Sequence, residues 1–323
     1  MAGRYPFPAV PDGWFSPLAS DALAVGEVLP LSTLGTDLVA FRTEDGAAHV
    51  FDAHCPHLGA HLGHGGRVCA GTLVCPFHGW SFAGDGTVVD VPGLDRSPPR
   101  TPARAWEVCE ANGRVFVWHH AGGEPPAFDV RRYRDDGAEW TPWHVNTYRV
   151  RVAVQDLTEN IIDRSHFWAV HDMEPPEDDR QEVTFDGPTM VVDQRIKVTA
   201  VAASGFEVHS RTVTNGPGIV AIEVKESGLD MLTYITQTPV DDELTDITIH
   251  FSMKALDDPE ATAAVAALHD EVTNRQFTQD VPIWEHKVYR ERPPLTAVDG
   301  PVHEYRRWFR RFYSGWTPTA DVR

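Results

Sequence analysis

The chain has 323 residues, and its 28 Lys and Arg against 47 Asp and Glu give a net charge of −19. Such an excess of acid disfavours binding to nucleic acids or to an anionic membrane surface. A hydrophobic content of 42% excludes a disordered chain, and no apolar run reaches the roughly 18 residues of a transmembrane helix. Four cysteines are too few for a disulfide-stapled scaffold, so we expect a cytoplasmic protein without a signal peptide.

From about residue 20 to residue 120 the sequence predicts a small all-β domain. Short apolar or alternating stretches are separated by Asp-Gly and Asn-Gly pairs, which favour hairpin turns. The predicted strands cover 27–31, 38–42, 49–52 and 114–119, the last pairing with 105–109, and the turns lie at 45–46, 85–86 and 112–113. The polar stretch 121–137, rich in Gly, Pro, Arg and Asp, is expected to be a linker.

The remainder of the chain predicts an α+β domain. In chain order it offers a strand at 147–154, a helix at 157–170, long strands between 182 and 253, and helices at 259–277 and 299–313. Because strands are followed by long helices, we expect helices on one face of an antiparallel sheet. The expected domains are 1–128 and 129–323.

Two cysteines and two histidines lie on two Gly- and Pro-rich loops of the first domain. One loop reads Cys-Pro-His and the other Cys-Pro-Phe-His, so each offers one thiolate and one imidazole. Cys55, His57, Cys75 and His78 thus match a Rieske [2Fe-2S] cluster, in which two Cys hold one iron and two His hold the other. A structural zinc site is the alternative, although a Cys-x-His pair is unusual in zinc ribbons and fingers.

A second group of metal-ligating residues begins the other domain. On a helix, His166 and His171 lie at about −60° and about +80° from Asp163, which places the three on one face. A five-residue spacing is wide for two ligands, so a π-bulge or a frayed helix end would be needed to bring the rings together. Two His and one carboxylate form the facial triad of mononuclear non-haem iron. Taken alone, the pattern is also compatible with two helical histidines that lie near an acid by chance.

The triad needs a carboxylate from elsewhere in the chain. The late helical region offers Asp270, Glu271, Asp280 and Glu285. We choose Asp280, because its helical neighbours are apolar and a carboxylate on an apolar face is costly unless it is paired or bound to metal. The alternative for Asp280 is a helix N-cap, since Pro282 is expected to interrupt the helix and could open a new one.

Asp-x-x-His-x4-His, placed after a Cys-x-His and Cys-x-x-His domain, resembles the signature of the Rieske non-haem iron oxygenases. The resemblance covers nearly the whole chain and implies a Rieske domain, a helix-grip catalytic domain and a homotrimer. It implies that His166 and His171 bind mononuclear Fe(II). It also implies a catalytic role for Asp163, which would bridge to a Rieske histidine, here His78, of the neighbouring subunit. Asn160 either lies near the iron or only begins the helix.

Three further segments narrow the resemblance. Residues 159–167, 280–295 and 306–315 are similar to oxygenase components of 3-ketosteroid 9α-hydroxylase and to cholesterol 7-desaturase-type enzymes, which implies a bulky apolar, steroid-like or polycyclic substrate. Beside the expected iron ligands, the candidate pocket residues are Phe167, Val170 and Phe277. The alternative for each of the three is a plain core residue, which is the more common role of such side chains.

The chain has no Gly-x-Gly-x-x-Gly fingerprint and no plant-type ferredoxin Cys spacing. Electrons are therefore expected from a separate NAD(P)H-dependent reductase, directly or through a ferredoxin. The predicted function is the terminal oxygenase component of a multicomponent Rieske monooxygenase, which uses O2 to hydroxylate its substrate. The alternatives are a cis-dihydroxylase or oxidative demethylase of the same family, a Rieske electron carrier, and a zinc-stabilised lipid-binding module.

Overall fold

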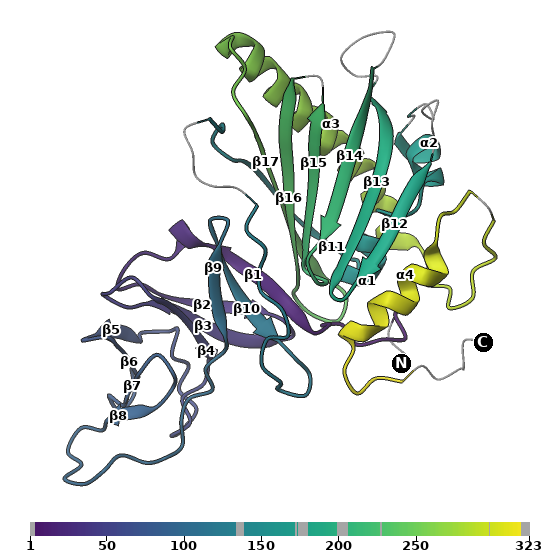
Figure 1. Cartoon of the computed structure of the whole chain (residues 1–323). Helices are drawn as coiled ribbons and strands as arrows, with labels where there is room; N and C mark the ends of the chain where they lie inside the picture. Colours follow the sequence, from purple (N-terminus) through teal and green to yellow (C-terminus); the bar gives the residue numbers. More distant parts are fainter. Residues whose placement is uncertain are drawn as a thin grey trace. The chain divides into compact units, whose positions relative to one another are not determined.

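The computed structural model describes residues 4–133, 139–171, 173, 180–198, 206–226, 228–296 and 298–317. The chain divides into two compact units (Figure 1). Asp12–Arg132 form one of them, here called the β unit. Met1–Pro11 and Tyr133–Arg323 together form the other, here called the sheet–helix unit.

This division differs from the expected domains at the N-terminus, because residues 1–11, expected in the first domain, belong to the sheet–helix unit. Phe7 stacks on Tyr313 with ring centroids 5.3 Å apart and meets Tyr289 edge-on at 5.1 Å. Tyr5 stacks on Phe7 in turn, at 5.3 Å. Aromatic burial therefore draws the first residues to the C-terminal part of the chain, a long-range contact that no local pattern reveals.

The β unit consists of three small antiparallel sheets. Their strands are β1 (Gly13–Ala19), β10 (Arg114–His119) and β9 (Val108–Ala111); β2 (Val28–Thr33), β3 (Thr36–Arg42) and β4 (Ala48–Asp52); and β5 (Arg67–Cys69), β6 (Thr72–Val74), β7 (Ser81–Phe82) and β8 (Val88–Asp90). A short 3-10 turn, η1 (Ser20–Ala22), follows β1. Gly46 and Gly113, at the predicted turns, have φ of 89° and 72°, the left-handed conformation that a glycine adopts without strain. The predicted hairpins β3–β4 and β9–β10 are confirmed.

The sheet–helix unit is built on a seven-stranded antiparallel sheet in the order β11-β17-β16-β15-β14-β13-β12. The strands are β11 (His144–Val150), β12 (Gln181–Asp186), β13 (Thr189–Val198), β14 (Phe206–Thr214), β15 (Ile219–Glu226), β16 (Leu229–Pro239) and β17 (Thr245–Met253). The helices are α1 (Val154–Glu159), α2 (Ser165–His171), α3 (Pro259–His286) and α4 (Val302–Phe309), with η2 (Arg310–Phe312) at the end. The predicted α+β architecture is confirmed, and α3 crosses one face of the sheet (Figure 1).

Helix α3 is longer than predicted. It begins at a cap in which the Asp258 side chain accepts a hydrogen bond from the Glu260 N–H at 2.9 Å, with Pro259 in the first turn. It then continues through Pro282, which we expected to interrupt it, to His286. A proline costs a helix one backbone hydrogen bond. Packing of Phe277 and Trp284 against the apolar face of the sheet holds the segment helical on both sides of that defect.

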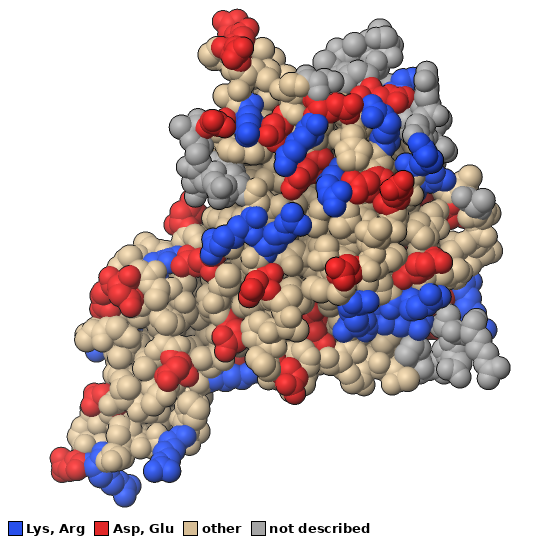
Figure 2. Space-filling model, viewed as in Figure 1, with Lys and Arg blue, Asp and Glu red and all other residues tan. Residues whose placement is uncertain are grey.

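The two faces of the sheet differ because side chains alternate along each strand. Ile249 of β17 and Ile235 of β16 point toward α3 and pack in one cluster with Phe277. Figure 2 shows acidic and basic side chains interspersed over strands of this unit. Several charged side chains of this sheet form cross-strand ion pairs. Arg211 and Asp193, for example, are 2.7 Å apart. Such exposed pairs contribute little stability, but they keep charge away from the buried face.

Among the described residues, no helix combines the length and the apolar character that crossing a bilayer requires.

Candidate metal centres and substrate cavity

The first candidate centre lies on two loops of the β unit that share one backbone pattern. In the loop after β4, the Cys55 N–H donates to the Ala60 carbonyl at 2.9 Å, and the Gly59 N–H donates to the Cys55 carbonyl at 2.9 Å. In the loop after β6, the Cys75 N–H donates to the Trp80 carbonyl at 2.8 Å. The Gly79 N–H donates to the Cys75 carbonyl at 3.2 Å. Each cysteine thus opens a closed turn of the same size.

A glycine with positive φ completes each of these turns. Gly59 has φ of 75° and Gly79 has φ of 72°, a conformation that costs a residue with a Cβ roughly 1–2 kcal/mol. A Cβ on Gly59 would meet no atom within 4 Å, whereas one on Gly79 would lie 2.9 Å from Pro92 Cγ. The second loop therefore requires glycine for packing as well as for its backbone.

The side chains on these loops fit a [2Fe-2S] cluster. Cys55 and Cys75 are buried at 3% and 2% exposure, and burial, with Cys75 nearby, raises the pKa of the Cys55 thiol to about 11. The ring centroids of His57 and His78 are 4.7 Å apart, and His57 stacks on Trp80 at 4.4 Å. Two inner thiols and two outer imidazoles are the donor set of a Rieske cluster, and metal would replace the proton that the buried thiol otherwise keeps.

The second candidate centre lies where the expected continuous helix is broken. We predicted a helix over 157–170, but α1 ends at Glu159 and α2 begins at Ser165. Asp163 lies in the break, and its Oδ1 accepts hydrogen bonds from the Ser165 N–H at 3.1 Å and the Ser165 hydroxyl at 3.0 Å. A short acidic side chain that bonds the backbone two residues ahead competes with helix, which accounts for the break.

The end of α2 explains how two histidines five residues apart can face each other. His171 is the last residue of this helix, and the Met173 N–H donates to the Phe167 carbonyl six residues earlier, at 3.1 Å. The helix thus widens at its end, in agreement with the frayed end that the spacing required. His166 and His171 face each other with ring centroids 5.2 Å apart.

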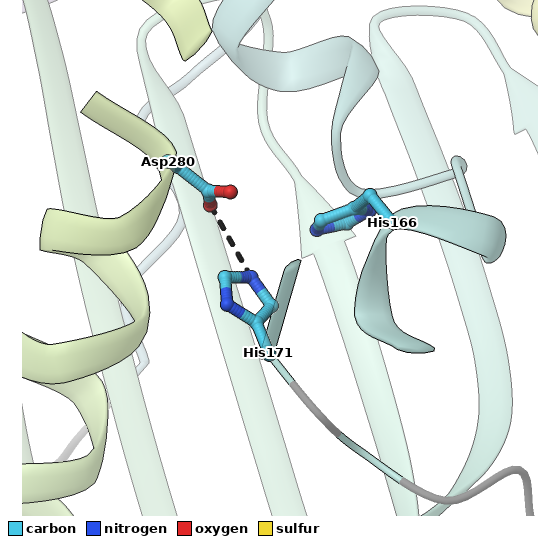
Figure 3. A group of neighbouring side chains, drawn as sticks. All are labelled: His166, His171 and Asp280. Atoms are coloured by element: carbon cyan, nitrogen blue, oxygen red, sulfur yellow. Dashed lines mark ion pairs between the residues drawn. The ribbon is translucent and has the colours of Figure 1, made fainter. Parts of the chain in front are cut away.

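Asp280 of α3 completes this centre. Figure 3 shows its carboxylate pointing toward His166 and His171, and one potential ligand atom from each residue lies within 4.8 Å of the other two. His171 Nε2 is 3.4 Å from Asp280 Oδ2, and the side chains of His171 and Asp280 are 3% and 11% exposed. Two imidazoles and one carboxylate in this arrangement could hold a divalent metal with coordination positions left open.

Hydrogen bonds at the Nδ1 atoms orient the two imidazoles toward the space between His166, His171 and Asp280. His166 Nδ1 donates to the Asp163 carbonyl at 2.5 Å, and His171 Nδ1 contacts Gln279 Oε1 at 3.1 Å. Both Nε2 atoms are thereby left as the lone-pair donors, the usual arrangement around a metal-binding histidine. Burial lowers the pKa of His166, opposed in part by Asp280, and this favours the neutral imidazole that binds metal. Gln279 was not among the predicted residues; its position beside Asp280 was the only available signal.

Asn160 lies at the centre and does not merely begin a helix. It is the C-cap residue of α1, and its Nδ2 donates to Asp280 Oδ2 at 3.2 Å. The predicted N-cap alternative for Asp280 does not occur, because α3 passes through this residue without a break. Of the other candidate carboxylates, Asp270 accepts a hydrogen bond from Asn146 at 2.5 Å, and Glu271 is exposed. Glu285 lies beyond Asp280 on α3 and, like these two, outside the His166, His171 and Asp280 group.

A cavity of about 450 Å³ opens from this centre between α3 and the sheet. Its walls are mostly apolar, and they include Phe167 and Phe277. Val170, the third expected pocket residue, is not among the residues that line this cavity. The volume falls in the range of small-molecule sites, about 300–1,000 Å³.

Known proteins match both units. A family model described as "3-Ketosteroid 9alpha-hydroxylase C-terminal domain" matches residues 117–313, and one described as "Rieske [2Fe-2S] domain" matches residues 13–125. The chain is 31% identical to cholesterol 7-desaturase of Bombyx mori, over 97% of this chain and 72% of that protein. It is also 31% identical to a probable 3-ketosteroid-9-alpha-monooxygenase, oxygenase component, of Rhodococcus rhodochrous, over 90% and 76%.

Solved structures share the fold. Dicamba monooxygenase bound to dicamba gives a TM-score of 0.72 at 19% identity, over 95% of this chain and 98% of that one. NdmA of Pseudomonas putida CBB5 with caffeine gives a TM-score of 0.71 at 21% identity, over 92% and 89%. With a [2Fe-2S] domain, a catalytic domain for mononuclear iron and these relatives, the chain belongs to the 3-ketosteroid 9α-hydroxylase family of Rieske-type oxygenases.

Proposed function

We propose that this protein is the terminal oxygenase component that hydroxylates a steroid-like, bulky apolar molecule. The observation that carries the proposal is the cavity of about 450 Å³, whose mostly apolar walls include His166, His171 and Asp280. The named relatives act on sterol or 3-ketosteroid substrates, which agrees with a cavity of this size and polarity. Electrons would come from a separate reductase, as the term oxygenase component implies for the relatives.

In this proposal each metal has its own ligands. Cys55, His57, Cys75 and His78 hold the [2Fe-2S] cluster. His166, His171 and Asp280 hold the mononuclear iron, which supplies the site of O2 activation when bound. The overall reaction consumes one O2, two electrons and two protons, and converts a substrate C–H bond to C–OH with release of one water.

Groups of the protein orient the proposed iron ligands and exclude water from the cavity. The Asp163 carbonyl and Gln279 hold the two imidazoles through their Nδ1 atoms, and Asn160 holds one oxygen of Asp280. Leu157 and Phe277 belong to the apolar cluster that borders the cavity near Asp280, so substrate rather than bulk water occupies the space beside the iron ligands. These contacts would fix the substrate carbon that reacts.

Isotope labelling tests the reaction. The holoenzyme, a reductase, NADH and 18O2 are incubated with 3-ketosteroids and sterols, and the products are analysed by mass spectrometry. One 18O atom per product supports the proposed monooxygenase. Two 18O atoms would indicate a dihydroxylase, and loss of two hydrogens without 18O would indicate a desaturase. Absence of any O2-dependent product, with both metals loaded, would contradict the steroid-like substrate.

We further propose that the protein acts as a homotrimer in which Asp163 carries electrons between subunits by contacting His78 of the partner subunit. The carboxylate of Asp163 uses Oδ1 for Ser165, and its Oδ2 has no partner among the described residues. One oxygen therefore stays available for an imidazole of another copy.

This bridge is tested with Asp163→Ala, because the variant keeps the backbone carbonyl that orients His166. Both metals should remain bound, while reoxidation of the reduced cluster in the presence of substrate and O2 slows by about 10- to 100-fold. A normal rate of cluster reoxidation, or a monomer by analytical ultracentrifugation, would contradict the bridge.

A further inference from the structure

Polar residues of α3 line the cavity at two well-separated positions. Asp280 lies at one end, and His269 lines the same cavity 11 residues earlier on the helix. At about 1.5 Å and 100° per residue, this separation corresponds to about 16 Å along the axis and only about 20° around it. Val272, Thr273 and Gln276 line the wall between them. The iron centre therefore occupies one end of an elongated space, and His269 lies well away from it.

His269 forms a small hydrogen-bonded cluster at this distal end. Its Nε2 lies 3.2 Å from the Thr233 hydroxyl of β16, and its Nδ1 lies 3.3 Å from the Thr273 hydroxyl of α3. The ring stacks on Phe251 of β17 with centroids 3.7 Å apart and planes inclined by 12°. Thr233, His269 and Thr273 all line the cavity, so the cluster joins the helix to the sheet at the cavity wall.

Counting the hydrogen-bond donors of His269, Thr233 and Thr273 shows that one threonine O–H has no acceptor within the cluster. Burial lowers the pKa of His269 to about 4, so its ring is neutral near neutral pH and carries a single N–H. That N–H donates to one threonine oxygen, while the other ring nitrogen accepts from the second threonine. The threonine that accepts keeps its own O–H, and this O–H has no other partner among the described residues.

The apolar surroundings make the spare threonine O–H unfavourable unless a hydrogen-bond acceptor reaches it. Leu229, Met231, Val265 and Leu268 line the cavity around the cluster. An O–H left without an acceptor in an apolar wall is unfavourable, and a ligand oxygen that accepts the spare O–H removes this cost. The second threonine, which donates to the ring, still offers lone pairs to a ligand hydroxyl.

We infer that Thr233, His269 and Thr273 bind a neutral hydroxyl or carbonyl oxygen at the far end of an elongated apolar substrate. The inference rests on the proposed function and narrows its substrate class. Thr273 and His269 lie 7 and 11 residues from Asp280, which separates the cluster from the proposed iron ligand by about 10–16 Å along the helix. We place the bound oxygen on the side chain of a steroid-like substrate, because the end of such a chain can lie that far from a reacting ring carbon.

Equilibrium binding of two probes tests the inference without turnover. One probe is a 3-ketosteroid with a saturated eight-carbon side chain, and the other carries an added hydroxyl on the terminal carbon of that chain. Their dissociation constants are measured by equilibrium dialysis on the metal-loaded protein, without reductase and without air. The hydroxylated probe should bind about five- to tenfold more tightly, the effect of one additional buried hydrogen bond.

Variants assign this preference to the cluster. Thr233→Val should reduce it below about twofold, and His269→Phe, which keeps an aromatic ring on Phe251, should do the same. Thr236→Val is the matched control: Thr236 lies on the same strand, is 1% exposed and does not line the cavity. It should keep the full preference.

The outcomes separate the inference from the proposed function. Equal affinity of the wild-type protein for both probes would overturn the inference alone, as would a preference that survives both Thr233→Val and His269→Phe. If neither probe binds, the steroid-like substrate of the proposed function is contradicted, and the inference is overturned with it.

Discussion

The two candidate metal centres of this protein are built in opposite ways. The β-unit centre takes its side chains from two loops, each closed by its own backbone hydrogen bonds and each completed by a glycine. The sheet–helix centre joins α2 to α3, and His171 and Asp280 are 109 positions apart in the chain. One geometry is fixed by local turns, whereas the other exists only when α3 is packed on the sheet. Damage to one centre should therefore leave the other intact.

The largest expected effect is the selective loss of one metal centre. Asp280→Ala removes the proposed carboxylate ligand from α3, so iron should fall from about three to about two per chain, with two acid-labile sulfides retained. Cys75→Ser should remove the sulfides, while Fe(II) still binds at the second centre. Iron and sulfide assays on protein purified without air measure both. If Asp280→Ala also lost its sulfides, the two centres would not be independent.

A smaller effect is expected from the hydrogen bond that orients the α3 ligand. Asn160→Ala leaves Asp280 Oδ2 without the donor at 3.2 Å and should weaken Fe(II) binding by about tenfold. The [2Fe-2S] absorbance should not change, because the cluster loops are local. Asn146→Ala is the control, since Asn146 also bonds an aspartate of α3, Asp270, away from the iron ligands. Equal losses of Fe(II) affinity in both variants would indicate a general disturbance of α3.

The smallest effects should appear within the two similar loops. Gly59→Ala and Gly79→Ala each introduce backbone strain of roughly 1–2 kcal/mol at positive φ. Only the Gly79 variant also places a Cβ 2.9 Å from Pro92 Cγ. The cluster absorbance should therefore disappear at a lower temperature in Gly79→Ala than in Gly59→Ala. The reverse order would show that the loops are not governed by backbone conformation and packing.

The difference between the centres also explains what the sequence could predict. The hairpins and the four ligands on the two loops follow from spacing, because turn residues and ligands are neighbours in the chain. The break between α1 and α2 was not predicted, since an Asp163 side chain that bonds Ser165 is one of several local options. The helical path through Pro282 was missed for a related reason: tertiary packing outweighed a local helix breaker. The roles of the individual metal ligands stay predictions.

Other features depend on contacts that no single segment contains. The N-terminal aromatic residues were expected in the first domain, but they pack with the sheet–helix unit, because their partner Tyr313 lies near the other end of the chain. The cluster at His269 was not predicted either, since it needs a threonine from β16 and a helix that lies over that strand. An isolated histidine in a helix gave no signal by itself.

Because both positions lie on the single helix α3, the distance between the His269 cluster and Asp280 depends on the number of residues between them. One residue inserted between Thr273 and Asp280 would turn His269 by about 100° relative to the iron ligand and take it out of the cavity wall. Seven inserted residues, two helical turns, would return it to nearly the same face about 10 Å farther away. The length of this interval in α3 thus sets the distance between the two sites. Relatives in which the interval differs by whole helical turns would bind substrates of different length.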